Sequence, residues 1–190
     1  LRGDEARQFV APRGTPRAAW FLWSVTWALA RLEAAPVNPM TTDAPKSTDP
    51  LIDETVAHLQ ALVRLDTSNP PGREMAVARY LDTVLREAGV ETWLDEPAPE
   101  RAAFIARIRG DGSQRPLLLM AHMDVVGVEA AKWSVPPFGA EIRDGYLYGR
   151  GAIDDKGMLA CNLMAMLLVR RAIVATGTLP TRERILLGTA

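Results

Sequence analysis

Segments with helical period alternate with short strand-like runs from Leu51 to Leu187, and this alternation restricts the fold more than any other feature of the sequence. Turn residues such as Asp144-Gly145 separate the runs. The predicted elements are helices at 51–63 and 73–88, strands at 90–94, 104–108, 117–120, 141–143 and 146–148, a helix at 155–176 and a strand at 184–187. Such an order indicates an α/β fold, with a mixed, largely parallel sheet and helices on both faces.

Residues 1–49 differ from the rest, because they mix Arg, Pro, Thr and Ala without a sustained period. We predict a disordered tail or upstream sequence, with Met40 as an alternative start. The apolar stretch at 18–30 is shorter than the ~20 residues that a membrane span needs. Its length also suits the apolar region of a signal peptide. The protein is therefore predicted to be cytoplasmic, or secreted or periplasmic if 18–30 is a signal peptide, and a membrane anchor is the last choice.

The charge balance argues against several classes of partner. Lys and Arg number 22 and Asp and Glu number 23, which leaves a net charge of −1. No basic excess is available for nucleic acid or for an anionic membrane surface, so neither is expected as a partner. The single cysteine, Cys161, cannot form an internal disulfide, and its apolar surroundings predict a small core residue.

A polar pair, His122 and Asp124, follows the apolar run at 117–120. A continuous apolar run is typical of a strand buried on both faces. Residues two apart in extended chain point to the same side, and functional groups in open α/β sheets gather beyond the carboxyl ends of strands. A metal-bound histidine usually donates its other ring N–H to an oxygen acceptor. Asp124 could be that acceptor directly, or could reach the site through water.

Two adjacent carboxylates, Asp154 and Asp155, open the helix predicted at 155–176. Such a pair is repulsive unless the helix N-terminus, and above all a metal ion, compensates it. An acidic pair at a helix start is also a common N-cap with a solvated charge, and a histidine and aspartate after a strand occur in many unrelated proteins. Lys156 is predicted to be a local charge partner of these aspartates.

Taken together, the two segments resemble the zinc-dependent aminoacylase, carboxypeptidase and succinyl-diaminopimelate desuccinylase family. The resemblance covers roughly residues 51–190 and rests on LLLMAHMDVV and KWSVPPFGAEIRDGYLYGRGAIDDKGMLA, with LVRLDTSNPPGRE upstream and RILLGTA downstream. It implies that His122 is a ligand of one metal, that Asp154 bridges two metals and that Asp124 is the catalytic-site residue that orients His122. It also implies a cis peptide between Asp154 and Asp155, and two Zn²⁺ ions as cofactors, with Co²⁺ or Mn²⁺ as alternatives.

The resemblance further implies that residues 51–190 form the N-terminal part of a larger dinuclear zinc-hydrolase catalytic domain. In this family a pair of glutamates, one of them the general base, follows the strand that RILLGTA resembles, and a lid and dimerisation domain lies further on. We expect the chain by itself to be inactive. The full-length protein, as a monomer or homodimer, would hydrolyse amide bonds of small peptides or N-acyl amino acids. The alternative is a non-catalytic relative that acts as a binding or interaction module.

Overall fold

The computed structural model describes residues 49–190. The tail predicted at 1–49, with its apolar stretch at 18–30, therefore lies outside the described residues except for Asp49. The elements in chain order are α2 (Pro50–Arg64), β1 (Ser68–Asn69), α3 (Glu74–Glu87), β2 (Glu91–Ala98), β3 (Arg101–Ile108), β4 (Leu117–His122), β5 (Val125–Val126), the 3₁₀-helix η1 (Ala130–Lys132), β6 (Glu141–Arg143), β7 (Tyr146–Tyr148), α4 (Lys156–Thr176) and β8 (Arg184–Thr189). Each predicted helix and strand is confirmed, and the short strands β1 and β5 form in addition.

Local signals account for where these elements begin and end. The Asp49 side chain accepts a hydrogen bond from the backbone N–H of Leu51 at 2.9 Å, and Pro50 occupies the first turn of α2. Gly177 ends α4 in the left-handed conformation with φ 67°, which glycine adopts at no steric cost. The β6–β7 hairpin turns at Asp144 and Gly145, both with positive φ.

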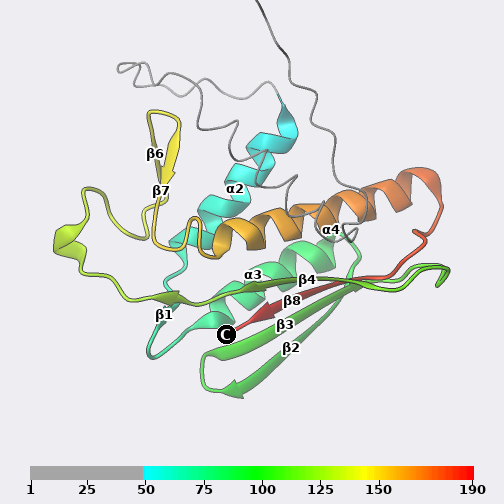
Figure 1. Cartoon of the computed structure of the whole chain (residues 1–190), viewed down its shortest axis with the longest axis horizontal. Helices are drawn as coiled ribbons and strands as arrows, with labels where there is room; N and C mark the ends of the chain where they lie inside the picture. Colours follow the sequence, from blue (N-terminus) through cyan, green and yellow to red (C-terminus); the bar gives the residue numbers. More distant parts are fainter. Residues whose placement is uncertain (1–48) are drawn as a thin grey trace, which may run out of the picture. The chain divides into compact units, whose positions relative to one another are not determined.

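The main sheet has four strands in the order β2-β3-β8-β4 (Figure 1). The pairs β2–β3 and β3–β8 are antiparallel, and only β4–β8 is parallel. The mixed α/β class is confirmed, whereas the largely parallel sheet is wrong for this part of the chain. A tight turn joins β2 to β3 and permits only an antiparallel pair, while the crossover through α4 lets β4 and β8 run parallel.

Helices α3 and α4 contact each other and cover one face of the sheet, α3 over β2 and β3 and α4 over β4 and β8 (Figure 1). Helix α2 packs on α4. The core between helices and sheet includes Leu81, Phe104, Leu163 and Leu186, all fully buried. Removing this apolar surface from water is the main force that holds the helices against the sheet.

The other face of the sheet carries no helix within residues 49–190, so the prediction of helices on both faces is not met there. Trp93, Ile105 and Met120 lie in one row across the strands and are 48%, 40% and 53% exposed. The run at 117–120 is likewise not buried on both faces, because β4 is an edge strand with α4 on one side only. An apolar run shows that both faces of a strand can be buried. Whether they are buried depends on segments that are distant in the sequence.

Helix α4 is one helix among the described residues that is long and apolar enough to cross a membrane by length and composition. The core helix of a soluble protein meets the same criterion, and Leu159, Leu163 and Leu167 of α4 are buried beside the sheet. This observation is therefore weak support for a membrane span. Cys161 is exposed, and its predicted place in the core is wrong, because it lies on the side of α4 that faces away from the packing.

Candidate metal centre

His122 and Asp124 lie at the carboxyl end of β4, as the spacing predicted. The ring nitrogen Nδ1 of His122 is 2.9 Å from the backbone oxygen of Asp124 and 3.0 Å from its carboxylate oxygen Oδ1. Two acceptors at Nδ1 favour a proton there, so Nδ1–H donates and Nε2 is the nitrogen left to meet a metal ion. This is the tautomer that a metal-binding histidine needs when it coordinates through Nε2.

The second predicted segment reaches the same place. Asp154 precedes α4 and brings its Oδ1 to 3.0 Å from Nε2 of His122, although the two residues are 32 positions apart. The Asp154 side chain is otherwise 88% exposed. The peptide between Asp154 and Asp155 is cis, which confirms what the resemblance implied. The structure thus brings together His122, Asp124 and Asp154.

Asp155 has a different environment from Asp154. Its Oδ2 accepts the backbone N–H of His122 at 3.3 Å, so this carboxylate ties the start of α4 to the end of β4. Burial raises the pKa of Asp155, the hydrogen bond from His122 opposes that rise, and the neighbouring Asp154 charge adds to it. Of the adjacent pair, Asp154 alone presents its carboxylate to the imidazole of His122.

The electrostatics around His122 favour positive charge. Burial by itself lowers the pKa of the imidazole, but the hydrogen bonds to Asp154 and Asp124 outweigh it, so the pKa is raised. Two carboxylates therefore share one imidazole, and this excess of negative charge suits a cation.

The donors fit part of a metal centre. Imidazole nitrogen and carboxylate oxygen bind Zn²⁺, and both also suit Co²⁺ and Mn²⁺. Within residues 49–190, however, no group of three or more His, Cys, Asp or Glu side chains is placed to hold a metal ion. A zinc site normally has three or four protein ligands. Among the described residues, His122 and Asp154 are thus too few by themselves to hold a zinc ion.

Sequence reasoning missed the loop between α2 and α3. Asn69 donates from Nδ2 to Oδ2 of Asp124 at 2.9 Å, and Thr67 donates from its hydroxyl to the backbone oxygen of Met123 at 2.7 Å. The signal in the sequence that could have singled out this loop is the run of polar side chains inside LVRLDTSNPPGRE.

Lys156 was predicted to be a charge partner of the neighbouring aspartates, and that prediction is wrong. The lysine is fully buried, and its Nζ donates instead to the backbone oxygen of Leu65, at the end of α2, at 2.5 Å. Burial lowers the pKa of Lys156 to about 8, against an opposing effect of the Asp66 charge. The side chain therefore connects the first turn of α4 to the end of α2.

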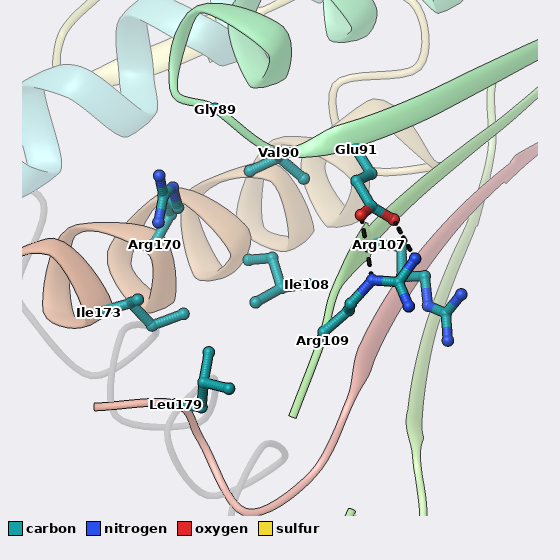
Figure 2. A pocket seen from close by; sticks show the side chains of 9 residues that line it. All are labelled: Gly89, Val90, Glu91, Arg107, Ile108, Arg109, Arg170, Ile173 and Leu179. Atoms are coloured by element: carbon teal, nitrogen blue, oxygen red, sulfur yellow. Dashed lines mark hydrogen bonds and ion pairs between the residues drawn. The ribbon is translucent and has the colours of Figure 1, made fainter. Parts of the chain in front are cut away.

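A cavity of about 160 Å³ lies at the opposite end of the sheet, where β4 and β8 begin (Figure 2). Arg109 donates from Nε and Nη2 to the two carboxylate oxygens of Glu91 at 3.0 and 3.2 Å. Arg107 donates to Glu183 at 2.7 Å. Because Arg107 and Arg109 already have carboxylate partners, and the third arginine of the lining, Arg170, donates to the backbone oxygen of Ala88 at 3.0 Å, we assign the cavity no catalytic role.

Known proteins are similar to the part of the chain that contains these residues. Residues 118–180, which include His122, Asp124 and Asp154, match the model of Peptidase family M20/M25/M40. The chain is 36% identical over 118 residues to N-formyl-4-amino-5-aminomethyl-2-methylpyrimidine deformylase of Halalkalibacterium halodurans, covering 60% of this chain and 28% of that protein. It is 40% identical over 118 residues to succinyl-diaminopimelate desuccinylase of Methylorubrum populi, covering 59% of this chain and 29% of that protein.

Solved structures share the fold. An M20 family metallo-carboxypeptidase from Sulfolobus solfataricus matches with a TM-score of 0.55 and 23% identity over 75% of this chain and 31% of its own. Human carnosine dipeptidase 1 matches with a TM-score of 0.56 and 20% identity over 72% of this chain and 31% of its own. The chain spans less than a third of the length of these relatives. The resemblance drawn from the two motifs is thereby confirmed over residues 118–180, which match the model of Peptidase family M20/M25/M40.

Proposed function

We propose that this chain contributes part of the active site of a metal-dependent hydrolase that cleaves amide bonds in small peptides or N-acyl amino acids. The observation that carries the proposal is the contact of His122 Nε2 with Asp154 Oδ1 at 3.0 Å, made while Asp124 engages the other ring nitrogen. The contact joins two motifs inside the segment that matches the peptidase family. The name of one human relative, N-fatty-acyl-amino acid synthase/hydrolase, agrees with an N-acyl amino acid substrate; it is 38% identical over 98 residues, covering 50% of this chain and 20% of that protein.

Each site residue has a distinct role in this proposal. His122 would bind one metal through Nε2, Asp154 would bridge two metals through its two oxygens, and Asp124 would hold the His122 tautomer without touching a metal. The ions would be Zn²⁺, with Co²⁺ or Mn²⁺ as alternatives. Bound at this place, such ions polarise a carbonyl and lower the pKa of a bound water.

Residues 51–190 would then form the N-terminal part of the catalytic domain, preceded by the tail at 1–49. Two observations support this division: the chain spans less than a third of the length of these relatives, and the described residues would supply two ligands of a larger set. The general base and the remaining ligands would come from the rest of the full-length protein, and the chain alone would be inactive. The substrate would be a small molecule, not a nucleic acid or a membrane, and the full-length protein would be a homodimer or a monomer.

The experiment is to prepare the full-length protein and measure its metal content and its hydrolysis of dipeptides and of N-acetyl and N-succinyl amino acids. We expect two metal equivalents per chain, cleavage of at least one amide, loss of both on treatment with a chelator, and recovery with added zinc or cobalt. A protein that binds no metal would overturn the proposal. A metal-loaded protein that cleaves none of the panel, and whose coding sequence has no acidic pair after RILLGTA, would instead support a non-catalytic binding module.

A further inference from the structure

Both oxygens of the Asp124 carboxylate have a side-chain partner. Oδ1 is 3.0 Å from Nδ1 of His122, and Oδ2 accepts the side-chain amide of Asn69 at 2.9 Å. A row of contacts therefore runs from Asn69 through Asp124 and His122 to Asp154. We propose that Asn69 is a positioning residue of the metal centre: its amide fixes the Asp124 carboxylate and, through it, the orientation of the His122 ring. This inference rests on the proposed function.

The backbone that carries Asn69 is fixed against the backbone on either side of Asp124. Strand β1 pairs in parallel with β5, so that Asn69 lies opposite Val126. The N–H of Val125 donates to the backbone oxygen of Thr67 at 3.1 Å, and the buried Thr67 hydroxyl donates to the oxygen of Met123 at 2.7 Å. Hydrogen bonds at 123 and 125 thus flank residue 124. An amide held in this way can set the rotation of a carboxylate, whereas a side chain on a free loop could not.

An amide is chemically suited to this position. The Asp124 side chain is mostly buried, and a buried carboxylate needs donors at both oxygens. The Asn69 amide supplies a donor without adding charge, and a hydrogen bond to an ionised acceptor is stronger than one between neutral groups. With Oδ2 held, Oδ1 stays in place to accept Nδ1–H, and Nε2 stays directed at Asp154.

The same loop also contacts the other half of the centre. Its first residue, Leu65, accepts a hydrogen bond from Nζ of Lys156, two positions after Asp154. The segment from Leu65 to Asn69 therefore contacts both motifs, one through a lysine and the other through an asparagine. Of these two contacts, that of the Asn69 amide reaches Asp124, whose carboxylate is hydrogen-bonded to the proposed ligand His122.

Three variants of the full-length protein test the role of Asn69. Asn69→Asp keeps the shape and removes the donor, and it also places a second carboxylate against Asp124. Asn69→Ala removes the amide without adding charge, and it keeps the test usable if Asn69→Asp fails to fold. Ser68→Ala is the matched control, because the Ser68 hydroxyl bonds to Asp66 within the same loop at 2.7 Å.

The readouts are the metal dissociation constant, measured by competition with a chromogenic chelator, and the separate values of kcat and KM. We expect Asn69→Asp and Asn69→Ala to weaken metal binding by about tenfold, the lower end for partners that orient a ligand. The loss of activity should fall on kcat with KM little changed, and Ser68→Ala should match the wild type in both. A loss of packing alone would lower the melting temperature of the metal-free protein without this selective change.

Two results would overturn the inference. One is metal binding of wild-type strength in both Asn69 variants, and the other is an equal loss in Ser68→Ala. If His122→Ala and Asp154→Ala lose metal while the Asn69 variants do not, the role of Asn69 fails and the proposed function stands. If His122→Ala and Asp154→Ala keep both metals, the proposed function fails and this inference fails with it.

Discussion

The two ends of the four-stranded sheet are both rich in charge, but they arrange it differently. Where β4 and β8 end, Asp124 and Asp154 both contact the single imidazole of His122. Where the same strands begin, each of two arginines has its own carboxylate, Arg107 with Glu183 and Arg109 with Glu91.

The difference distinguishes the surface proposed to bind metal from a surface whose charges are already paired. Paired charges at the beginning of the strands satisfy one another and need no ligand. At the carboxyl end the carboxylates outnumber the positive groups that contact them, and the polar atoms point toward one place. A folded protein tolerates an excess of negative or positive charge at a site where a bound ligand of opposite charge neutralises it. Substitutions at the two ends would show whether they differ in this way.

Asp154→Ala should have the largest effect. In the full-length protein this substitution removes the proposed bridge, so we expect loss of both metals and a fall in turnover of at least about a thousandfold, which corresponds to about 4 kcal/mol of transition-state stabilisation. His122→Ala should lose at least one metal. Metal analysis and steady-state kinetics measure both. Two retained zinc equivalents in Asp154→Ala would remove Asp154 as the bridge.

The buried Lys156 predicts how stability depends on pH. Its pKa is about 8 in the folded protein against an ordinary value of 10.5, so between these values the unfolded chain binds a proton that the folded chain does not. The free energy of unfolding should therefore rise with pH from about 8 to 10.5, by at most about 3 kcal/mol, and below pH 8 the full cost of burying the charge remains.

Urea unfolding at several pH values checks this, with Lys156→Met as the comparison. The variant has no titrating group at this position, so the rise should disappear from its profile. The same rise in both proteins would show that Lys156 is not its source.

Asp124→Ala should have a smaller effect than Asp154→Ala and a different signature. Because Asp124 contacts the ring of His122 and would not touch a metal, its loss should reduce turnover by about ten- to a hundredfold. Metal content at saturating zinc should change less than turnover. Kinetics and metal analysis of the same preparation measure the two quantities, and an equal loss of both would indicate that Asp124 is a direct ligand.

Arg109→Ala, at the opposite end of the sheet, should have the smallest effect. Its ion pair with Glu91 is largely exposed, and exposed pairs contribute little to stability. Metal binding and turnover should be unchanged, since the substitution lies at the far end of the strands. A loss of metal in this variant would break the distinction between the two ends.

The elements that could be predicted are those that local sequence determines. Asp49 before Pro50, Asp144-Gly145 and Gly177 each act through neighbouring backbone, and the structure places a helix start, a hairpin and a helix end at them. Sheet direction and cover could not be predicted in the same way. Both depend on which segments pack together in space. The apolar side chains of Trp93, Ile105 and Met120 stay exposed because no helix of the described residues packs on their face of the sheet.

In the candidate site, too, some contacts could be predicted from the sequence and others could not. The contact between His122 and Asp154 follows from the parallel pairing of β4 with β8, which α4 connects in the sequence. The two motifs predicted that these residues would lie close together. Asn69 lies 55 positions before its partner Asp124, and the polar run around it in LVRLDTSNPPGRE does not indicate which distant residue its amide contacts. Long-range polar contacts of this kind have no local period or cap that could reveal them.

A tryptophan on the exposed face of the sheet can serve as an intrinsic fluorescence probe of that face. Trp93 is half exposed in the row with Ile105 and Met120, and the emission of an indole shifts toward the blue when water is excluded from it. The sequence has five tryptophans, so a variant that retains Trp93 alone would isolate this signal. The colour of its fluorescence would then report whether another surface has come to lie against the sheet.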